Sequence, residues 1–312
     1  MARITGIDAD FVPLNLGGNP FGWTADAPTS FTILDAFAEA GGSFVDTADM
    51  YSEWVPGSTG GDSETIIGDW MAARGNRDHI VVATKAGRLS TLKGLAHATV
   101  TTALDASLRR LRTDHVDLFY SHGDDPDTPI ADQVRTFDAL VRAGKIRAIG
   151  LSNYSPERLR EWVETADALG ATRPAAVQPR YSLVTRHEYE PTLAPVIDEF
   201  GLAVFPYSTL ASGFLSGKYR TGADLTGARA GAAERYLNAD GLAVVEALAT
   251  VAASHDVELT TVALAWLLAR GVTAPIASVS RPEQLPALMA ATTLQLTGAE
   301  VAALDAASAP FA

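Results

Sequence analysis

The stretch "SFVDTADMY" (residues 43–51) decides the fold, because a short apolar strand ends within it in side chains able to do chemistry. Asp46, Asp49 and Tyr51 follow the apolar pair Phe44 and Val45 within seven positions. A buried strand that ends in two carboxylates and a phenol indicates a strand whose carboxyl end opens into a pocket. The question is whether other strands of the chain end in the same way.

Short apolar or β-branched runs alternate with longer segments of helical period along the whole chain, which is typical of βαβ units and a parallel sheet. The runs predict eight strands, at residues 12–17, 43–46, 80–85, 116–122, 146–152, 175–178, 203–207 and 274–278. Helices are predicted between them, among others at residues 30–40, 64–73, 101–111 and 156–169. Eight alternations in 312 residues predict an α/β fold, a (β/α)8 TIM barrel formed by one domain over residues 1–312.

Polar residues follow the predicted strands in a regular way. Every strand after the first ends in a polar side chain, and in chain order these are Asp46, Lys85, His122, Ser152 with Asn153, Gln178, Tyr207 and Ser278. In a barrel these ends meet on one face, where the loops after the strands form the active site. Each residue alone has a simpler interpretation, since a lone Asp is often a helix cap and a lone His is often structural. Seven such ends together favour a site.

Composition excludes several classes of partner. The net charge of −13 and pI near 4.8 argue against nucleic acid or an anionic membrane surface, because both require a basic face. The absence of cysteine excludes disulfides, thiolate nucleophiles and Cys-ligated metals. The N-terminal segment "MARITGIDAD" has no apolar signal-peptide core, and no later segment approaches the 18 apolar residues of a membrane span. We therefore expect a soluble cytoplasmic protein, without a prediction of its oligomeric state.

The side chains at the strand ends suit the reduction of a carbonyl, in which hydride reaches carbon and the oxygen must gain a proton. Tyr51 can donate that proton, and a nearby cation, Lys85, would lower its pKa from the ordinary value of about 10. Asp46 would keep Lys85 charged and oriented, and a neutral His122 would hydrogen-bond the carbonyl oxygen. The alternative is an Asp46 and Lys85 ion pair that only braces the barrel, with Tyr51 and His122 packed nearby.

These residues carry a family resemblance. The motifs "FVDTADMY", "VVATKAG", "VDLFYSHGDDPDTP", "IGLSNYS", "AVQPRYSLV", "FPYSTLASGFLSGKY" and "SVSRPEQL" follow the order typical of the aldo-keto reductase superfamily, so the chain resembles it from about residue 11 to 290. The resemblance implies a barrel that binds a nicotinamide cofactor without a Rossmann fold, and a catalytic tetrad of Asp46, Tyr51, Lys85 and His122. It further implies cofactor contacts from Ser152, Asn153 and Gln178 to the carboxamide, from Tyr207 to the nicotinamide ring, from Ser208, Leu210, Gly213, Leu215 and Lys218 to the pyrophosphate, and from Ser278.

The segment "SRPEQ" (residues 280–284) is the predicted contact for the adenosine end of the cofactor. Ser280 and Glu283 form a capping-box pattern, which predicts a helix N-terminus that attracts anions. Arg281 would add a charge-assisted contact to a 2′-phosphate, and Gln284 is included in the predicted contacts. We therefore expect NADPH rather than NADH, although Glu283 opposes a phosphate and Leu288 stands where the family often has Asn.

The substrate is expected to be a small carbonyl compound or alcohol, with aromatic walls from Trp23 and Trp54 in loops after the first two strands. Loop packing is the alternative role for Trp54. The acidic run "GDDPD" (123–127) resembles a metal cluster, but a solvated loop explains it and no metal is predicted. Two other functions stay open, namely a non-catalytic NADPH-sensing subunit like the potassium-channel β subunits and a Schiff-base lyase with Lys85 as nucleophile.

Overall fold

Eight parallel strands form one curled sheet in the computed structural model, which describes residues 1–219 and 230–312. Their order in the sheet is β10-β3-β4-β5-β6-β7-β8-β9. Thr273 and Ile276 donate backbone hydrogen bonds to the carbonyls of Val204 and Pro206, which links the two outer strands. The predicted (β/α)8 fold class is confirmed. The bounds are β3 Asn15–Gly17, β4 Phe44–Asp46, β5 Val81–Ala86, β6 Val116–Ser121, β7 Ile146–Ser152, β8 Ala176–Gln178, β9 Ala203–Val204 and β10 Ile276–Ala277.

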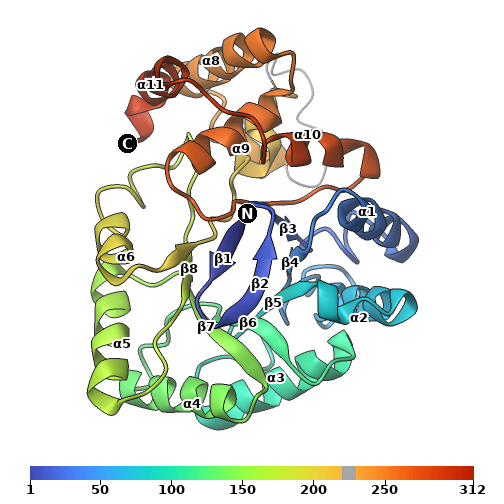
Figure 1. Cartoon of the computed structure of the whole chain (residues 1–312), viewed down its shortest axis with the longest axis vertical. Helices are drawn as coiled ribbons and strands as arrows, with labels where there is room; N and C mark the ends of the chain where they lie inside the picture. Colours follow the sequence, from blue (N-terminus) through green and yellow to red (C-terminus); the bar gives the residue numbers. More distant parts are fainter. Residues whose placement is uncertain (220–229) are drawn as a thin grey trace.

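Helices surround the sheet (Figure 1). They are α1 Ala27–Glu39, α2 Asp62–Arg74, η1 Arg77–His79, α3 His97–Leu111, α4 Ile130–Arg142, α5 Pro156–Leu169, α6 Ala194–Phe200, η2 Ala211–Ser216, α7 Ala230–Glu234, α8 Ala239–His255, α9 Leu259–Ala269, η3 Pro282–Gln284, α10 Leu285–Ala290, α11 Gly298–Ala307 and η4 Ala309–Phe311. The four helices predicted by residue range correspond to α1, α2, α3 and α5. In the part of the chain that the structure describes, no helix combines the length and apolarity that crossing a membrane requires.

Helix α5 illustrates how the local sequence sets these elements. Ser155 is its N-cap and accepts a hydrogen bond from the backbone N–H of Arg158, and Pro156 occupies the first turn, where its missing N–H costs nothing. The helix ends at Gly170, which adopts a left-handed conformation with φ 60°. Leu159, Trp162, Val163 and Ala166 form the buried face toward the barrel.

An N-terminal hairpin closes one end of the barrel, and it was not among the predicted strands, the first of which begins at residue 12. The hairpin pairs β1 Ala2–Ile4 with β2 Ile7–Phe11 in antiparallel fashion, and it lies across the centre of the barrel in Figure 1. Ile4, Ile7 and Phe11 pack inside the barrel on residues such as Phe44, at the start of β4. The count of eight strands is therefore wrong by these two. The alternation in "IDADF" was the available signal.

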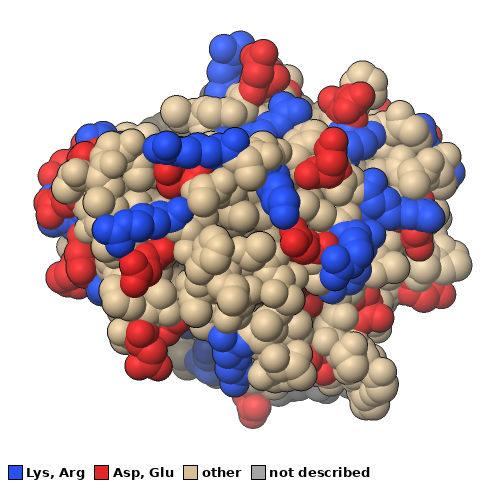
Figure 2. Space-filling model, turned by 90° about the horizontal axis from the view of Figure 1, so that it is seen from below, with Lys and Arg blue, Asp and Glu red and all other residues tan. Residues whose placement is uncertain are grey.

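Charges of both signs are interspersed on the face seen in Figure 2. Surface ion pairs include Arg142 with Asp138 and Lys145 with Asp105. Such exposed pairs contribute at most about 1 kcal/mol each, so most stability comes from the core between sheet and helices. Trp70, Trp162 and Trp266 are its largest side chains and are fully buried.

Candidate active site

Asp46, Tyr51, Lys85 and His122 come together at the carboxyl end of the barrel. Asp46 is the last residue of β4, Lys85 lies in β5, His122 directly follows β6, and Tyr51 lies in the turn after β4. Lys85 Nζ lies 2.5 Å from Asp46 Oδ2, and donates to the Tyr51 hydroxyl at 2.9 Å and to the carbonyl of Thr47 at 2.7 Å. The Tyr51 hydroxyl lies 3.4 Å from Asp46 Oδ2, so the three side chains form a closed triangle.

The ammonium of Lys85 is held charged in a fully buried position. Burial alone would lower the pKa of Lys85, but the negative charge of Asp46 and the contact with Tyr51 outweigh it and raise that pKa above its ordinary value. Both members of the ion pair are buried, with exposed side-chain fractions of 0% for Lys85 and 1% for Asp46. A buried pair of this kind adds little net stability, but removal of one partner costs several kcal/mol, on the order of 3–5.

The phenol of Tyr51 experiences two opposing effects. Burial raises the pKa of Tyr51 above its ordinary value, whereas the charge of Lys85 lowers it. The expected net lowering of the Tyr51 pKa by Lys85 is wrong, because burial is the larger effect. The hydroxyl is therefore protonated at neutral pH and can donate a proton.

His122 is neutral at physiological pH. Burial, together with the positive charges of Lys85 and Arg88, holds the pKa of His122 well below its usual range. Its ring lies 6.2 Å from the ring of Tyr51 between centroids, at an angle of 73°. The backbone N–H of His122 donates to the carbonyl of Ala86, which fixes the end of β6 against β5. A neutral imidazole in this position can donate one hydrogen bond to a polar group beside Tyr51.

The residues expected at the carboxamide, Ser152, Asn153 and Gln178, form a connected group at the ends of β7 and β8. Gln178 Nε2 donates to Asp46 Oδ1 at 2.9 Å, and the Ser152 hydroxyl donates to the Gln178 carbonyl at 3.0 Å. Asn153 adopts a left-handed conformation with φ 59° and accepts a hydrogen bond from the Tyr207 hydroxyl at 2.8 Å. A non-glycine residue held in this conformation indicates a position determined by its surroundings, as is frequent at functional sites.

The segment expected at the pyrophosphate, from Ser208 to Lys218, has an unusual backbone. Ser208, Ala211, Ser212 and Gly213 all have positive φ. Runs of left-handed and right-handed residues turn successive N–H groups toward one concavity, which is the geometry that binds anions. Leu210 is partly buried, and Leu215 is fully buried in the core, so a cofactor contact from Leu215 would have to use its backbone. The Lys218 side chain lies against Gly213.

The segment from Ser208 to Asn238 contains the helices η2 and α7. Residues 220–229 of that segment lie outside the described residues.

The segment expected at the adenosine end is capped differently from the prediction. Gln284, rather than Glu283, folds back, and its Oε1 accepts hydrogen bonds from the backbone N–H groups of Ser280 and Arg281 at 3.0 and 3.2 Å. The predicted capping box of Ser280 and Glu283 is therefore wrong. The first turn is the 3₁₀ helix η3, and its N-cap is Arg281. The Arg281 side chain is exposed, and Ser278 Oγ lies close to Gly17.

The two tryptophans expected at the substrate pocket contact each other and Tyr51. The rings of Trp23 and Trp54 are 5.5 Å apart in an edge-to-face arrangement, and the ring of Trp54 lies 6.3 Å from that of Tyr51. Trp54 is 43% exposed, which is unusual for an indole and leaves an apolar surface beside the phenol. Trp54 therefore packs on Trp23 within the loops and also presents an exposed face beside Tyr51.

Sequence reasoning missed a polar group beneath the tetrad. Glu64 is fully buried in α2, accepts a hydrogen bond from Thr84 and pairs with Arg110 at 2.7 Å. Asp49 lies nearby with 1% exposure, and neither of its carboxylate oxygens has a hydrogen-bond partner within the described ranges. Burial and the charge of Glu64 raise the pKa of Asp49 to about 7. The sequence signals for this group were Asp49 in "SFVDTADMY" and the acidic start of "DSETIIGDW".

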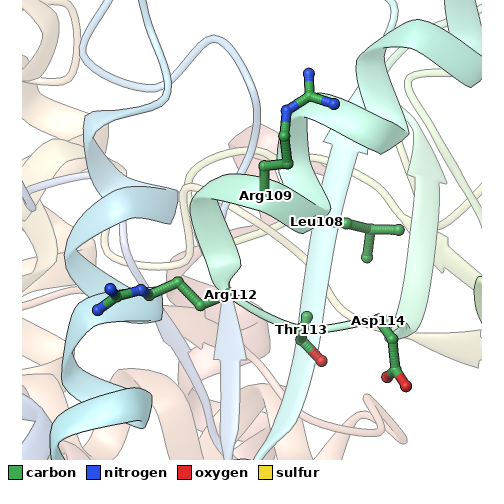
Figure 3. Close-up of a pocket in the computed structure, with 5 residues that line it drawn as sticks. All are labelled: Leu108, Arg109, Arg112, Thr113 and Asp114. Carbon is green, nitrogen blue, oxygen red and sulfur yellow. The ribbon is translucent and has the colours of Figure 1, made fainter.

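Other hollows on the surface are separate from the tetrad. Figure 3 shows one lined by Leu108, Arg109, Arg112, Thr113 and Asp114, with the two arginines pointing away from each other. These residues precede β6, so the hollow lies at the opposite end of the barrel. On the tetrad side, the acidic loop has structural partners, since Asp124 pairs with Arg158 and Asp125 accepts a hydrogen bond from the backbone of Leu95.

Comparison with known proteins agrees with this architecture. The model of the aldo/keto reductase family matches residues 13–309. The chain is 34% identical to aflatoxin B1 aldehyde reductase member 4 of Homo sapiens over 81% of this chain and 78% of that protein. It is 30% identical to an aryl-alcohol dehydrogenase of Pestalotiopsis microspora (94% and 78%), and 33% identical to a probable voltage-gated potassium channel subunit beta of Oryza sativa (79% and 76%). The chain belongs to the aldo/keto reductase family.

Proposed function

We propose that the protein reduces a small aldehyde or ketone to an alcohol with NADPH, and that Tyr51 supplies the proton. One observation carries the proposal, namely the closed triangle of Asp46, Lys85 and Tyr51 at the carboxyl end of the barrel. A protonated phenol that touches a charged ammonium can donate a proton and leave a stabilised phenolate.

Each side chain has a distinct task in this proposal. Tyr51 donates its proton to the carbonyl oxygen as negative charge develops there, and Lys85, 2.9 Å away, stabilises the resulting phenolate. Neutral His122 donates a hydrogen bond that orients the same oxygen. Asp46 keeps Lys85 charged, which disfavours the Schiff-base alternative because a protonated amine is not a nucleophile.

The residues fit a nicotinamide dinucleotide. The left-handed backbone positions between Ser208 and Gly213 are of a kind that can bind a pyrophosphate, and the hydrogen bond from the Tyr207 hydroxyl to Asn153 would hold the Tyr207 ring for stacking. The amides of Asn153 and Gln178 can hydrogen-bond a carboxamide. When bound, the cofactor would supply the hydride to the carbonyl carbon. Arg281 is the basis for NADPH rather than NADH, because its exposed guanidinium can bind a 2′-phosphate.

The test is the loss of NADPH absorbance with a panel of aromatic aldehydes, α-diketones and keto sugars. Tyr51→Phe should lower turnover at least about 100-fold with nearly unchanged NADPH affinity, because general acid catalysis contributes about 100-fold to 10,000-fold. Tyr189→Phe is the matched control, since Tyr189 is a buried tyrosine outside the tetrad whose ring packs on Tyr181. A loss below tenfold in Tyr51→Phe would remove Tyr51 from this role.

The similarity to potassium-channel β subunits supports a second candidate, a cofactor-sensing subunit. A cofactor-sensing subunit would bind NADPH tightly and would reduce none of the carbonyls in the panel. Isothermal titration calorimetry measures the NADPH affinity. Turnover that depends on Tyr51 would exclude it as the sole function.

A further inference from the structure

Arg88 is an exposed arginine two residues beyond the end of β5. In the described part of the chain, no hydrogen bond or ion pair engages its guanidinium. Arg158, another arginine at this end of the barrel, is bound by both Asp124 and Glu161. The five N–H donors of Arg88 are therefore available to a ligand.

The guanidinium of Arg88 lies on the backbone of Gly123, the residue directly after His122. A Cβ atom built on Gly123 would lie 2.6 Å from both Nε and Nη2 of Arg88, so the arginine occupies the space that a side chain at this position would fill. Gly123 is buried, whereas Arg88 is exposed. The Arg88 side chain therefore extends from the end of β5 to the end of β6, instead of pointing away from the barrel.

The charge of Arg88 also acts across the mouth of the barrel. It lowers the pKa of His122, and together with Arg180 it opposes the rise that burial causes in the pKa of Tyr207. Tyr207 follows β9, which is four places from β5 in the order of the eight strands and so lies on the opposite side of the barrel. The charge of Arg88 therefore acts on residues on both sides of the opening, while its guanidinium lies against Gly123 at the end of β6.

We propose that Arg88 binds a carboxylate or phosphate on the carbonyl substrate, so that the site selects negatively charged aldehydes and ketones. The inference rests on the proposed reductase function. An arginine with free donors binds a carboxylate in a bidentate manner. In a chain with a net charge of −13, an anionic substrate needs such a local cation. The tetrad acts on the carbonyl, and Arg88 selects the group at the other end of the molecule.

The experiment compares 4-carboxybenzaldehyde with its neutral methyl ester, methyl 4-formylbenzoate. Arg88→Gln should raise KM for the acid at least about tenfold, change its kcat less than twofold, and leave KM for the ester unchanged. Arg88→Lys should recover part of the loss. Arg109→Gln is the matched control, because Arg109 is an exposed arginine at the opposite end of the barrel, and it should behave like the wild type.

Two outcomes would overturn the proposal. Equal increases of KM for acid and ester would show that Arg88 supports the pocket without recognising charge. A matching loss of NADPH affinity in Arg88→Gln would assign Arg88 to a cofactor phosphate instead, so the dissociation constant of NADPH is measured in each variant.

A binding measurement separates this inference from the reductase function. With NADP⁺ present, the wild type should bind 4-(hydroxymethyl)benzoate more tightly than 4-(hydroxymethyl)benzamide by isothermal titration, and Arg88→Gln should lose this preference. Absence of turnover on every carbonyl would contradict the reductase function. The preference for the acid over the amide, measured by calorimetry, would still test whether Arg88 binds an anion. Equal binding of acid and amide by the wild type would contradict the anion site.

Discussion

Gln178 donates a hydrogen bond from Nε2 to Oδ1 of Asp46 at 2.9 Å, although 132 positions separate the two residues. Lys85 contacts the other oxygen, Oδ2, so each oxygen of this buried carboxylate has a donor. Gln178 therefore fixes the orientation of Asp46, which in turn fixes Lys85. The same amide is a proposed cofactor contact, which couples the binding of a carboxamide to the geometry of the triangle.

We expect Gln178→Met to lower the free energy of unfolding by about 1–3 kcal/mol, because methionine keeps the volume but leaves Oδ1 of Asp46 without a donor. Urea denaturation measures the change. Gln295→Met is the control, since Gln295 is exposed and its side chain has no hydrogen bond within the described residues, and it should change stability by about 0.5 kcal/mol or less. An equally small effect of Gln178→Met would mean that this hydrogen bond does not hold Asp46.

The ion pair of Asp46 and Lys85 should show strong coupling in a double-mutant cycle. Lys85→Met leaves a buried carboxylate without a cation and should cost about 3–5 kcal/mol, whereas the double variant with Asp46→Leu should cost much less. Chemical denaturation of the two single variants and the double variant gives the coupling energy. Additive costs would show that the two charges do not depend on each other.

The positions of the tetrad were predictable because they depend on a local pattern. Each of these strands is a short apolar run followed by a polar residue. In a parallel barrel all such polar residues lie at the carboxyl ends of the strands, on the same face. Asp46, Lys85 and His122 follow from that pattern, Tyr51 follows from its position five residues after Asp46 and from the need for a proton donor, and the family resemblance implied the same four residues.

Contacts that depend on side-chain conformation between distant segments could not be predicted in this way. The hydrogen bond from Gln178 to Asp46, the return of Gln284 onto the backbone and the reach of Arg88 over Gly123 each require packing that no local pattern specifies. The predicted direction of the Tyr51 pKa shift was wrong for the same reason, because the burial of Tyr51 depends on the whole fold. The hairpin of β1 and β2 was missed because its strands are short and rich in polar residues.

Asp49 should make the stability of the protein fall as the pH rises from about 4 to 7. The pKa of Asp49 is about 7 in the folded protein and about 3.8 in the unfolded chain, so between these values the folded state holds a proton that the unfolded state has lost. Stability is therefore highest below the unfolded pKa and is lost as the pH rises through the folded one. One pKa unit corresponds to about 1.4 kcal/mol, so the penalty above pH 7 is at most about 4 kcal/mol.

Asp49→Asn removes this titration and should raise the melting temperature at pH 8 more than at pH 5. The control is Asp78→Asn, because Asp78 is exposed on the surface and should shift the melting temperature little at either pH. Thermal unfolding followed by circular dichroism at both pH values gives the comparison. The same shift of Asp49→Asn at pH 5 and pH 8 would show that the carboxyl does not titrate in this range.

Arg281 should distinguish the two reduced cofactors. Arg281 follows β10, its side chain is exposed, and its backbone N–H donates to Gln284, so the cap holds the backbone while the guanidinium faces solvent. A hydrogen bond to a charged group contributes about 1.5–3 kcal/mol, so Arg281→Ala should raise the dissociation constant of NADPH at least about tenfold and leave that of NADH unchanged. Fluorescence titration of both cofactors against wild type and variant measures this ratio. If both constants rise by the same factor, Arg281 contacts a part that the two cofactors share, and the preference for NADPH loses its structural basis.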